Sequence, residues 1–228
     1  MSKKTTVTTE LAEGVFLQQH LLSLAGCQMG RNVSLLRQAG GKLLVHSRAE
    51  FSPVDLAAIR EIGEPAWLLE ATNMHDTHAR SARAALPDIP YLVPPGFKNA
   101  EALGAAPISS ASDELLAEGI EIIERQGMPK LREHVIFHRH SKTLVVADLL
   151  FNFPIEANWW TRTFLRATAG VKQFPAMSRL LRLYIKDRTA FSESLAQISA
   201  LDSDRIIVGH GDSIVRDTRI SLNRCLLD

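Results

Sequence analysis

The stretch ATNMHDTHAR, residues 71–80, follows a short apolar run and precedes a segment rich in alanine and arginine. Its two histidines, His75 and His78, are three residues apart, with an aspartate and a threonine between them. An ordinary helix start would use the same residues, because Asp76 or Thr77 could cap a helix that begins near His78. The stretch therefore has two interpretations: part of a metal site, or a capped helix start that carries two histidines.

Two further polar residues stand at the ends of apolar runs. Asp148 lies near the end of KTLVVADLLF, residues 142–151, and His210 follows the run in DRIIVGHGDSI, residues 204–214. Alone, each is typical of a turn residue. Strand ends that present histidines and carboxylates to a shared cleft are, however, a common way to build a site. The three positions together therefore indicate a candidate site.

Patterns of strands and helices surround these positions. The segment 52–63 begins with Ser52 and Pro53 and ends on Gly63, which predicts a helix. Consecutive strands, including a hairpin through Gly40 and Gly41, open the chain, so a simple alternation of strands and helices is disfavoured and two helix-covered sheets are expected. Strands are predicted at 14–22, 32–38, 42–47, 66–71, 90–96, 120–126, 133–140, 142–151 and 204–214; helices at 52–63, 79–86, much of 158–201 and from about 217; a loop at 97–112.

Composition and charge limit the classes of function. The chain has 228 residues, which suits one domain, 1–228, with a helical insertion at about 155–202. A net charge of +1, from 26 basic and 25 acidic residues, gives no reason to expect nucleic acid or an anionic membrane as partner. The N-terminus lacks a signal-peptide pattern, and no apolar run has the length of a membrane span. We therefore expect a soluble, cytoplasmic protein, in which Cys27 and Cys225 are buried thiols.

The motifs together resemble the metallo-β-lactamase-fold superfamily over residues 14 to 215. Its Thr-His-x-His-x-Asp-His motif is similar to Thr72–His78, its aspartate after an apolar strand is similar to Asp148, and its closing GHG turn is similar to His210. The early hairpin, GRNVSLLRQAGGKLLVHS, is similar to the family's opening strands. The resemblance implies an α/β fold, a four-layer αββα sandwich of two mixed β-sheets flanked by helices, in a hydrolase that uses divalent metal ions.

The metal motif is degenerate here. Asn73 stands where the family has its first histidine, and only His134 or Glu133 offers a replacement for a later histidine, so the first metal position is expected to be lost. Thr77 replaces the motif aspartate at the second position. The remaining ligands that the resemblance implies are His75, His78, Asp148 and His210, enough for at most one ion of zinc, iron or manganese.

Two classes of function follow. The first is a metal-dependent hydrolase that attacks an ester, thioester or phosphoester bond, with Asp148 and His210 as catalytic residues. The second is a non-catalytic protein, with or without metal, that uses the cleft to bind a small molecule or a protein, because Thr77 cannot act as a base near neutral pH. An iron oxidoreductase with two histidines and one carboxylate is a third, more remote, alternative.

Several features leave their roles open. The substrate or ligand is expected to be a small molecule, and a homodimer remains an alternative to a monomer. The pair Trp159 and Trp160, at the start of the helical insertion, suits either an aromatic anchor for helix packing or a cover over the cleft. His138 and His140 flank an arginine in a predicted strand and are expected to face solvent rather than a metal.

Overall fold

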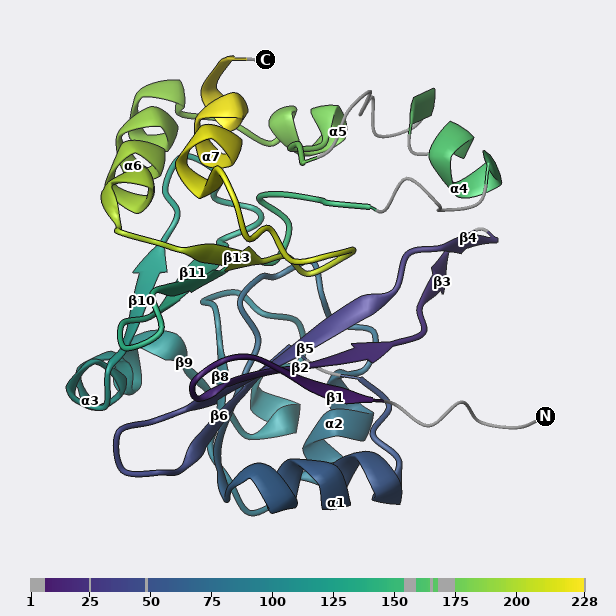
Figure 1. Ribbon diagram of the computed structural model, residues 1–228, viewed down its shortest axis with the longest axis vertical. Helices are drawn as coiled ribbons and strands as arrows, with labels where there is room; N and C mark the ends of the chain where they lie inside the picture. The colour runs from purple at the N-terminus through teal and green to yellow at the C-terminus, as the bar shows by residue number, and fades with distance from the viewer. Residues whose placement is uncertain are drawn as a thin grey trace.

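Two β-sheets stack face to face, with helices on both outer sides, in the computed structural model (Figure 1). The structure describes residues 7–24, 26–47, 49–153, 159–164, 166–167 and 175–227. Both sheets are mixed, since each contains antiparallel and parallel pairs. The predicted four-layer αββα sandwich is therefore confirmed.

The first sheet has seven strands in the order β1-β2-β5-β6-β7-β8-β9. The pairs from β1 to β6 are antiparallel, and β6, β7, β8 and β9 run parallel to one another. A separate small hairpin, β3 and β4, extends between β2 and β5 along the chain. The bounds are β1 Thr8–Ala12, β2 Val15–His20, β3 Ser23–Leu24, β4 Cys27–Gln28, β5 Arg31–Arg37, β6 Leu43–His46, β7 Pro65–Leu69, β8 Tyr91–Val93 and β9 Ala105–Pro107.

The second sheet has four strands in the order β10-β11-β12-β13. The first three are antiparallel neighbours, and β13 returns parallel to β12 after the helical segment. This parallel return places the chain after β12 and the chain after β13 at the same edge of the sheet, which matters for the site below. The bounds are β10 Ile120–Glu124, β11 His134–His138, β12 Thr143–Val145 and β13 Arg205–Ile207.

Helices form the outer layers. Helix α1 (Pro53–Ile62) has the predicted cap, in which Ser52 and Asp55 bond reciprocally, and it lies with α2 (Ala79–Ala85) on the outer side of the first sheet (Figure 1). Helices α6 (Arg188–Ala200) and α7 (Thr218–Leu227) cover the second sheet (Figure 1). The shorter helices are η1 Glu101–Leu103, η2 Ile108–Ser110, α3 Ser112–Ala117, α4 Trp159–Phe164 and α5 Arg179–Arg182.

Buried apolar side chains fill the three spaces between the layers. One cluster, with Leu36, Leu69 and Val145, lies between the two sheets. A second, with Ile59 and Ala82, joins α1 and α2 to the first sheet, and a third joins α6 and α7 to the second sheet. Burial of this apolar surface drives the stacking of the layers, and it holds the strand ends that carry the polar residues in fixed positions.

Three predictions about local structure need correction. Residues 97–112 are not simply a loop, since they form η1, β9 and η2; β9 pairs in parallel with β8, and its sequence, Ala-Ala-Pro, has little strand character of its own. Helix α2 is capped by neither Asp76 nor Thr77, because His78 itself occupies the N-cap position without a side-chain hydrogen bond. His138 does not face solvent: it is 3% exposed, whereas His140 follows the strand and is exposed.

Other predictions stand as follows. Cys27 and Cys225 are buried and are not joined in a disulfide. Within the described residues, no helix is both long and apolar enough to cross a bilayer. The helical stretch predicted for 158–201 is present as α4, α5 and α6, but residues 154–158, 165 and 168–174 of the predicted insertion lie outside the described residues.

Candidate metal centre

Three buried donors meet beyond the ends of strands that belong to the two sheets. His75 lies in the turn after β7, Asp148 follows β12 and His210 follows β13. One ligand atom from each lies within 4.8 Å of the others, and His75 Nε2 is 3.1 Å from Asp148 Oδ1. Strands from both sheets therefore deliver their polar ends to one point. The structure brings together three of the four residues predicted as metal ligands.

A buried carboxylate orients His75. Glu70, directly after β7 and fully buried, places Oε1 3.4 Å from His75 Nδ1, while His75 Nε2 faces Asp148. Burial by itself lowers the pKa of His75, but the nearby Asp148 and Glu70 carboxylates outweigh it and raise that pKa to about 9. A carboxylate behind a histidine is also the usual support for a metal-bound imidazole, because it fixes the tautomer and the ring orientation.

A backbone carbonyl orients His210. Its Nδ1 donates to the carbonyl oxygen of Gly30 at 2.6 Å, so Nε2 is left to face the other two donors. Burial, followed by the neighbouring His75, lowers the pKa of His210 to about 4. A neutral imidazole is the form that can ligate a metal. His210 therefore has both the orientation and the charge that a ligand needs.

The glycines beside His210 explain the GHG sequence. A Cβ on Gly209 would collide with the carbonyl oxygen of Ala147, and a Cβ on Gly211 would collide with that of Asn152. Gly211 also has φ of +97°, a conformation that L side chains rarely adopt. Both glycines therefore let the turn that carries His210 pack directly on the chain that carries Asp148.

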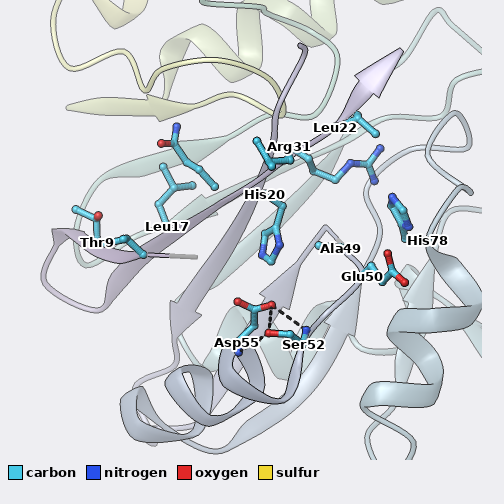
Figure 2. Close-up of a pocket in the computed structure, with 13 residues that line it drawn as sticks. Thr9, Leu17, His20, Leu22, Arg31, Ala49, Glu50, Ser52, Asp55 and His78 are labelled. Atoms are coloured by element: carbon cyan, nitrogen blue, oxygen red, sulfur yellow. Dashed lines mark hydrogen bonds between the residues drawn. The ribbon is translucent and has the colours of Figure 1, made fainter. Parts of the chain in front are cut away.

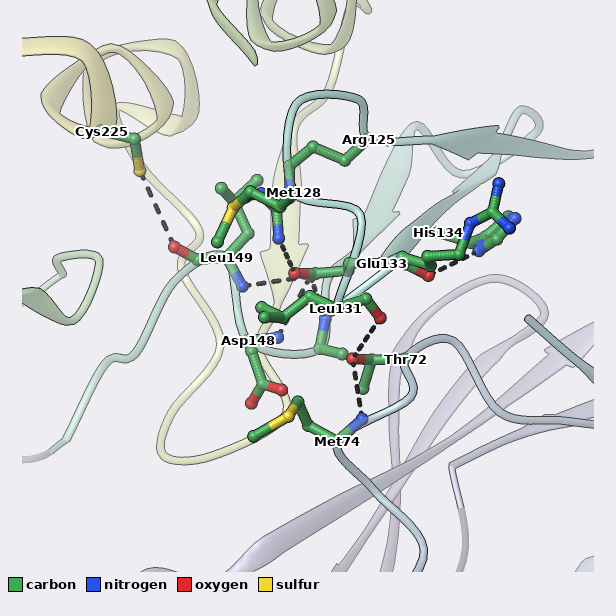
Figure 3. A network of polar contacts seen from close by, with 12 residues as sticks. Thr72, Met74, Arg125, Met128, Leu131, Glu133, His134, Asp148, Leu149 and Cys225 are labelled. Atoms are coloured by element: carbon green, nitrogen blue, oxygen red, sulfur yellow. Dashed lines mark hydrogen bonds and ion pairs between the residues drawn. The ribbon is translucent and has the colours of Figure 1, made fainter. Parts of the chain in front are cut away.

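Glu133 holds the turn that carries Asp148 (Figure 3). Its Oε1 accepts hydrogen bonds from three consecutive backbone N–H groups, those of Ala147, Asp148 and Leu149, at 2.9–3.1 Å. Its Oε2 accepts from the guanidinium of Arg125 at 2.7 Å, and both of these side chains are buried. Glu133 is thus a positioning residue for Asp148 rather than a metal ligand, because both of its oxygens are engaged within the chain.

Asp148 itself is an ionised acceptor. Burial raises its pKa, but the positive charges that face it, His75 first and Arg31 among the others, outweigh burial and lower the pKa to about 2. Its carboxylate is therefore available at neutral pH as an anionic oxygen donor, the one carboxylate in the three-residue group.

The other residues of the opening motif lie away from this group. His78, the fourth predicted ligand, is half-buried at the start of α2 and lines a cavity described below. Asn73 donates from Nδ2 to the carbonyl oxygen of Pro95. Asp76 is exposed and lies 3.6 Å from Lys98, and Thr77 is exposed. The group that the structure assembles is therefore His75, Asp148 and His210.

Sequence reasoning missed the supporting residues. Glu70 was not singled out, although a glutamate at the end of the apolar run AWLLEA is an unusual residue in a buried position. Glu133 was considered only as a replacement ligand, and His134, the other replacement considered, points Nδ1 to the carbonyl oxygen of Arg132. No pattern in the sequence marks Gly30 as the acceptor for His210.

These contacts provide a test of whether the residues suit a metal ion. Two imidazoles and one carboxylate are a common donor set for Zn²⁺, and also for Fe²⁺ in sites with open positions. His75 directs Nε2 to Asp148 and has the Glu70 carboxylate 3.4 Å from Nδ1, whereas His210 donates from Nδ1 to the Gly30 carbonyl oxygen. The donor chemistry and its supporting contacts fit a single divalent ion, held by three protein ligands.

Solved structures with the same architecture are metallo-β-lactamases. The enzyme from Erythrobacter litoralis has 14% sequence identity and a TM-score of 0.66, with 98% of this chain and 97% of that chain covered. DIM-1 has 12% identity and a TM-score of 0.65, with 97% and 96% covered. FIM-1 from Pseudomonas aeruginosa, in its mono-zinc form, has 15% identity and a TM-score of 0.62, with 95% and 92% covered. The protein therefore has the metallo-β-lactamase fold.

Similarity in sequence does not extend this conclusion. No protein-family model matches the chain. A search of curated proteins also finds no match. Sequence identities near 14% to these structures define the fold alone.

Proposed function

We propose that this protein binds one divalent metal ion through His75, Asp148 and His210 and acts as a metal-dependent hydrolase. The observation that carries the proposal is the buried cluster of three donors within 4.8 Å, drawn from both sheets. Its supporting contacts favour the same role, because Glu70, Gly30 and Glu133 each constrain one of the three donors. Outer contacts of this kind are typical of metal sites.

A metal ion bound at such a site supplies a Lewis acid that polarises the substrate and lowers the pKa of a bound water. The chain contributes two imidazoles, of which His210 is already neutral and His75 gives up its proton when a metal binds. It also contributes one carboxylate and an environment from which most water is excluded, since all three donors are buried. A second ion is disfavoured, because Asp148 is the one carboxylate in the group and Asn73 and Thr77 replace two ligands of the family motif.

The reaction that this site suits is hydrolysis of an ester, thioester or phosphoester. Oxygen of water bonds to the carbonyl carbon or the phosphorus, the bond to the leaving oxygen or sulfur breaks, and the leaving group takes a proton from water. Asp148 can orient the water through its carboxylate, and His210, held by the Gly30 carbonyl, supplies a neutral imidazole ligand beside it. These are the roles we assign to the two predicted catalytic residues.

The second candidate is a non-catalytic protein that uses the same fold for binding. The exposure of Asp76 and Thr77 favours it, because the motif segment brings no additional carboxylate to the group and the family's proton acceptor has no replacement there. A site that binds metal without hydrolysing esters would be a structural or ligand-binding site.

Metal analysis tests the first part of the proposal. Protein purified without a metal-affinity tag and dialysed against a zinc buffer is expected to retain about one equivalent of metal by elemental analysis. His210→Ala should lose it, and His140→Ala, which alters an exposed histidine outside the group, should keep it. Retention of metal by His210→Ala would exclude the site. Iron in anaerobically purified protein would instead favour an oxidoreductase.

An activity assay tests the second part. Metal-loaded protein is expected to hydrolyse 4-nitrophenyl acetate or bis(4-nitrophenyl) phosphate, with activity lost on chelation and in His210→Ala. Stoichiometric metal together with no hydrolysis above the His210→Ala background would favour the non-catalytic candidate.

A further inference from the structure

The turn that carries His210 is held from the first sheet by a short segment at the start of β5, residues 30–32. His210 Nδ1 donates to the carbonyl oxygen of Gly30 at 2.6 Å, and the backbone N–H of Asn32 donates to the carbonyl oxygen of Gly209 at 3.0 Å. The strand β5 belongs to the first sheet, whereas the turn follows β13 of the second sheet. A candidate metal ligand is therefore fixed by contacts between the two sheets.

The side chain of Asn32 spans this turn. Its Nδ2 donates to the carbonyl oxygens of Val208 and Gly211, at 2.7 Å each. These two residues stand before and after the pair Gly209 and His210, so a single amide group holds both ends of the turn. An amide nitrogen carries two hydrogens, and the two bonds use both of them. Because Asn32 is 3% exposed, little water competes for these bonds.

The amide at Asn32 complements the carboxylate that supports Asp148. At the Asp148 turn, Glu133 accepts from three consecutive backbone N–H groups. At the His210 turn, the neighbouring groups are carbonyl oxygens, which need a donor, and Asn32 supplies it. An aspartate of the same shape would place lone pairs against these oxygens. The hydrogens of the Asn32 amide, rather than its size, therefore suit this position.

The neighbouring Arg31 faces another part of the molecule. Successive side chains of a strand point to opposite faces of the sheet. Arg31 accordingly lines a cavity of about 590 Å³, together with His20, Ser52 and His78 (Figure 2). None of the three candidate metal donors lines that cavity. Within the segment 30–32, Asn32 is thus the residue whose side chain bonds to the His210 turn.

The opposite side of the turn packs on the chain that carries Asp148. A Cβ at Gly209 or Gly211 would collide with backbone there, so the two chains are in direct contact. The turn is therefore held between the Asp148 segment and Asn32. A productive site needs its ligands within about 0.5 Å of their places. Loss of the Asn32 amide would release one side of the turn and displace the His210 imidazole, while the packing on the other side remains.

We propose that Asn32 is a positioning residue for His210, whose amide fixes the turn across the two sheets and keeps the imidazole beside Asp148. The inference rests on the proposed function only for the claim that His210 binds a metal ion. The placement of the imidazole depends on the hydrogen bonds of the chain itself, so it exists in the metal-free protein as well.

NMR of chelator-treated, ¹⁵N-labelled protein tests the placement without metal. The proton on His210 Nδ1, bonded to Gly30, is expected to give a ring N–H signal that exchanges slowly with solvent. In Asn32→Ala this exchange should be at least about tenfold faster. Gln18→Ala is the matched control, because Gln18 is a fully buried amide that bonds to Thr8 outside the metal group, and it should leave the signal unchanged. Equal signals in Asn32→Ala and the unmodified protein, or equal losses in the two variants, would overturn the proposal.

Zinc affinity, measured by competition with a fluorescent chelator, tests the consequence for the metal site. Asn32→Ala is expected to weaken zinc binding about tenfold, as is typical when a contact behind a ligand is lost. Gln18→Ala should change the affinity less than about threefold, although it also removes a buried hydrogen bond. A lower free energy of unfolding with unchanged zinc affinity in Asn32→Ala would show a purely structural role and overturn the proposal.

Hydrogen exchange in the unmodified protein provides the test if Asn32→Ala does not fold. Both Nδ2 protons of Asn32 should exchange at least about tenfold more slowly than those of Asn73, whose amide bonds to Pro95 at an exposed position. Equal rates would overturn the proposal.

The two readouts separate this inference from the proposed function. If the unmodified protein binds no zinc but the His210 signal depends on Asn32, the proposed function fails and the positioning role stands. If the unmodified protein binds zinc and Asn32→Ala binds it equally well, the proposed function stands and this inference fails.

Discussion

His75 and His78 belong to the same motif, three residues apart, but their surroundings differ in every respect that determines chemistry. His75 is buried, faces Asp148 and has Glu70 behind it. His78 is half-buried, begins α2 and lines a cavity with Arg31 and His20. The segment between β7 and α2 thus directs one histidine to the candidate metal centre and the other to a separate cavity, so spacing in a motif does not by itself assign two residues to one site.

The largest expected effect concerns Glu133, which supports the turn that carries Asp148, the residue that His75 Nε2 faces. Glu133→Ala should lower the free energy of unfolding by about 3–5 kcal/mol, because it leaves the buried guanidinium of Arg125 without its carboxylate. It also leaves the three N–H groups of the Asp148 turn unbonded. Urea denaturation monitored by circular dichroism measures the change.

A partly exposed ion pair provides the control for that experiment. Glu124→Ala removes the pair between Glu124 and Arg132, 3.0 Å apart, which is expected to cost at most about 1 kcal/mol. Equal effects of the two substitutions would show that the Glu133 contacts do not hold the Asp148 turn.

The direct comparison of the two histidines is a pair of identical substitutions. His75→Ala should weaken zinc binding by more than about 100-fold, because it removes a ligand, whereas His78→Ala should change it less than about threefold. Competition with a fluorescent zinc chelator gives both affinities. A large loss in His78→Ala would return His78 to the metal site, as the sequence predicted.

A smaller effect is expected for the residue behind His75. Glu70→Gln keeps the shape of the side chain and removes the charge next to His75 Nδ1, so the affinity for zinc should fall about tenfold. The same chelator competition applies, with Glu64→Gln, outside the metal group, as control. An unchanged affinity would mean that the carboxylate does not orient the ligand.

The smallest expected effect is on the pH dependence of stability and concerns His138, a buried histidine outside the candidate metal centre. His138 Nε2 donates to the carbonyl oxygen of Arg37, Nδ1 accepts from Ser141, and burial lowers the pKa of this imidazole. In the unfolded chain the His138 imidazole binds a proton near pH 6.5, whereas in the folded protein it binds one only at lower pH. The buried neutral imidazole therefore contributes to the free energy of unfolding above pH 6.5, and this contribution declines as the pH falls below 6.5. The free energy of unfolding should therefore decrease less between pH 7 and 5.5 in His138→Gln than in the unmodified protein. Identical pH slopes would contradict this.

Much of the fold could be predicted from local patterns. The hairpin through Gly40 and Gly41, the capped helix α1 and the strands β2, β5, β6, β10 and β11 each have a clear signal in hydrophobic periodicity or turn chemistry. Strand β9 was missed because a three-residue Ala-Ala-Pro segment becomes a strand only through pairing with β8. The cap of α2 was mispredicted because several polar residues precede the helix and the tertiary position of the turn selects among them.

The site could be predicted only in part. The sequence indicated Asp148 and His210 by their positions at the ends of apolar strands, and His75 by its motif. It did not indicate Glu70 or the role of Glu133, because their functions depend on which side chains lie behind the ligands. It also placed His138 at the surface, since alternation along a strand does not reveal that the first sheet covers that position.

The sequence by itself indicated two helix-covered sheets and the three polar strand ends, because periodicity, caps and turn residues act over a few neighbouring positions; the four-layer sandwich was implied by the resemblance of its motifs to a known family. Only the tertiary structure decided that His75 joins Asp148 and His210 while His78 joins Arg31 and His20. That choice depends on the packing of two sheets and on contacts between residues as far apart in the chain as Gly30 and His210. Such contacts have no local signature, because the energy that selects them comes from burial and hydrogen bonds that exist only after the layers have stacked.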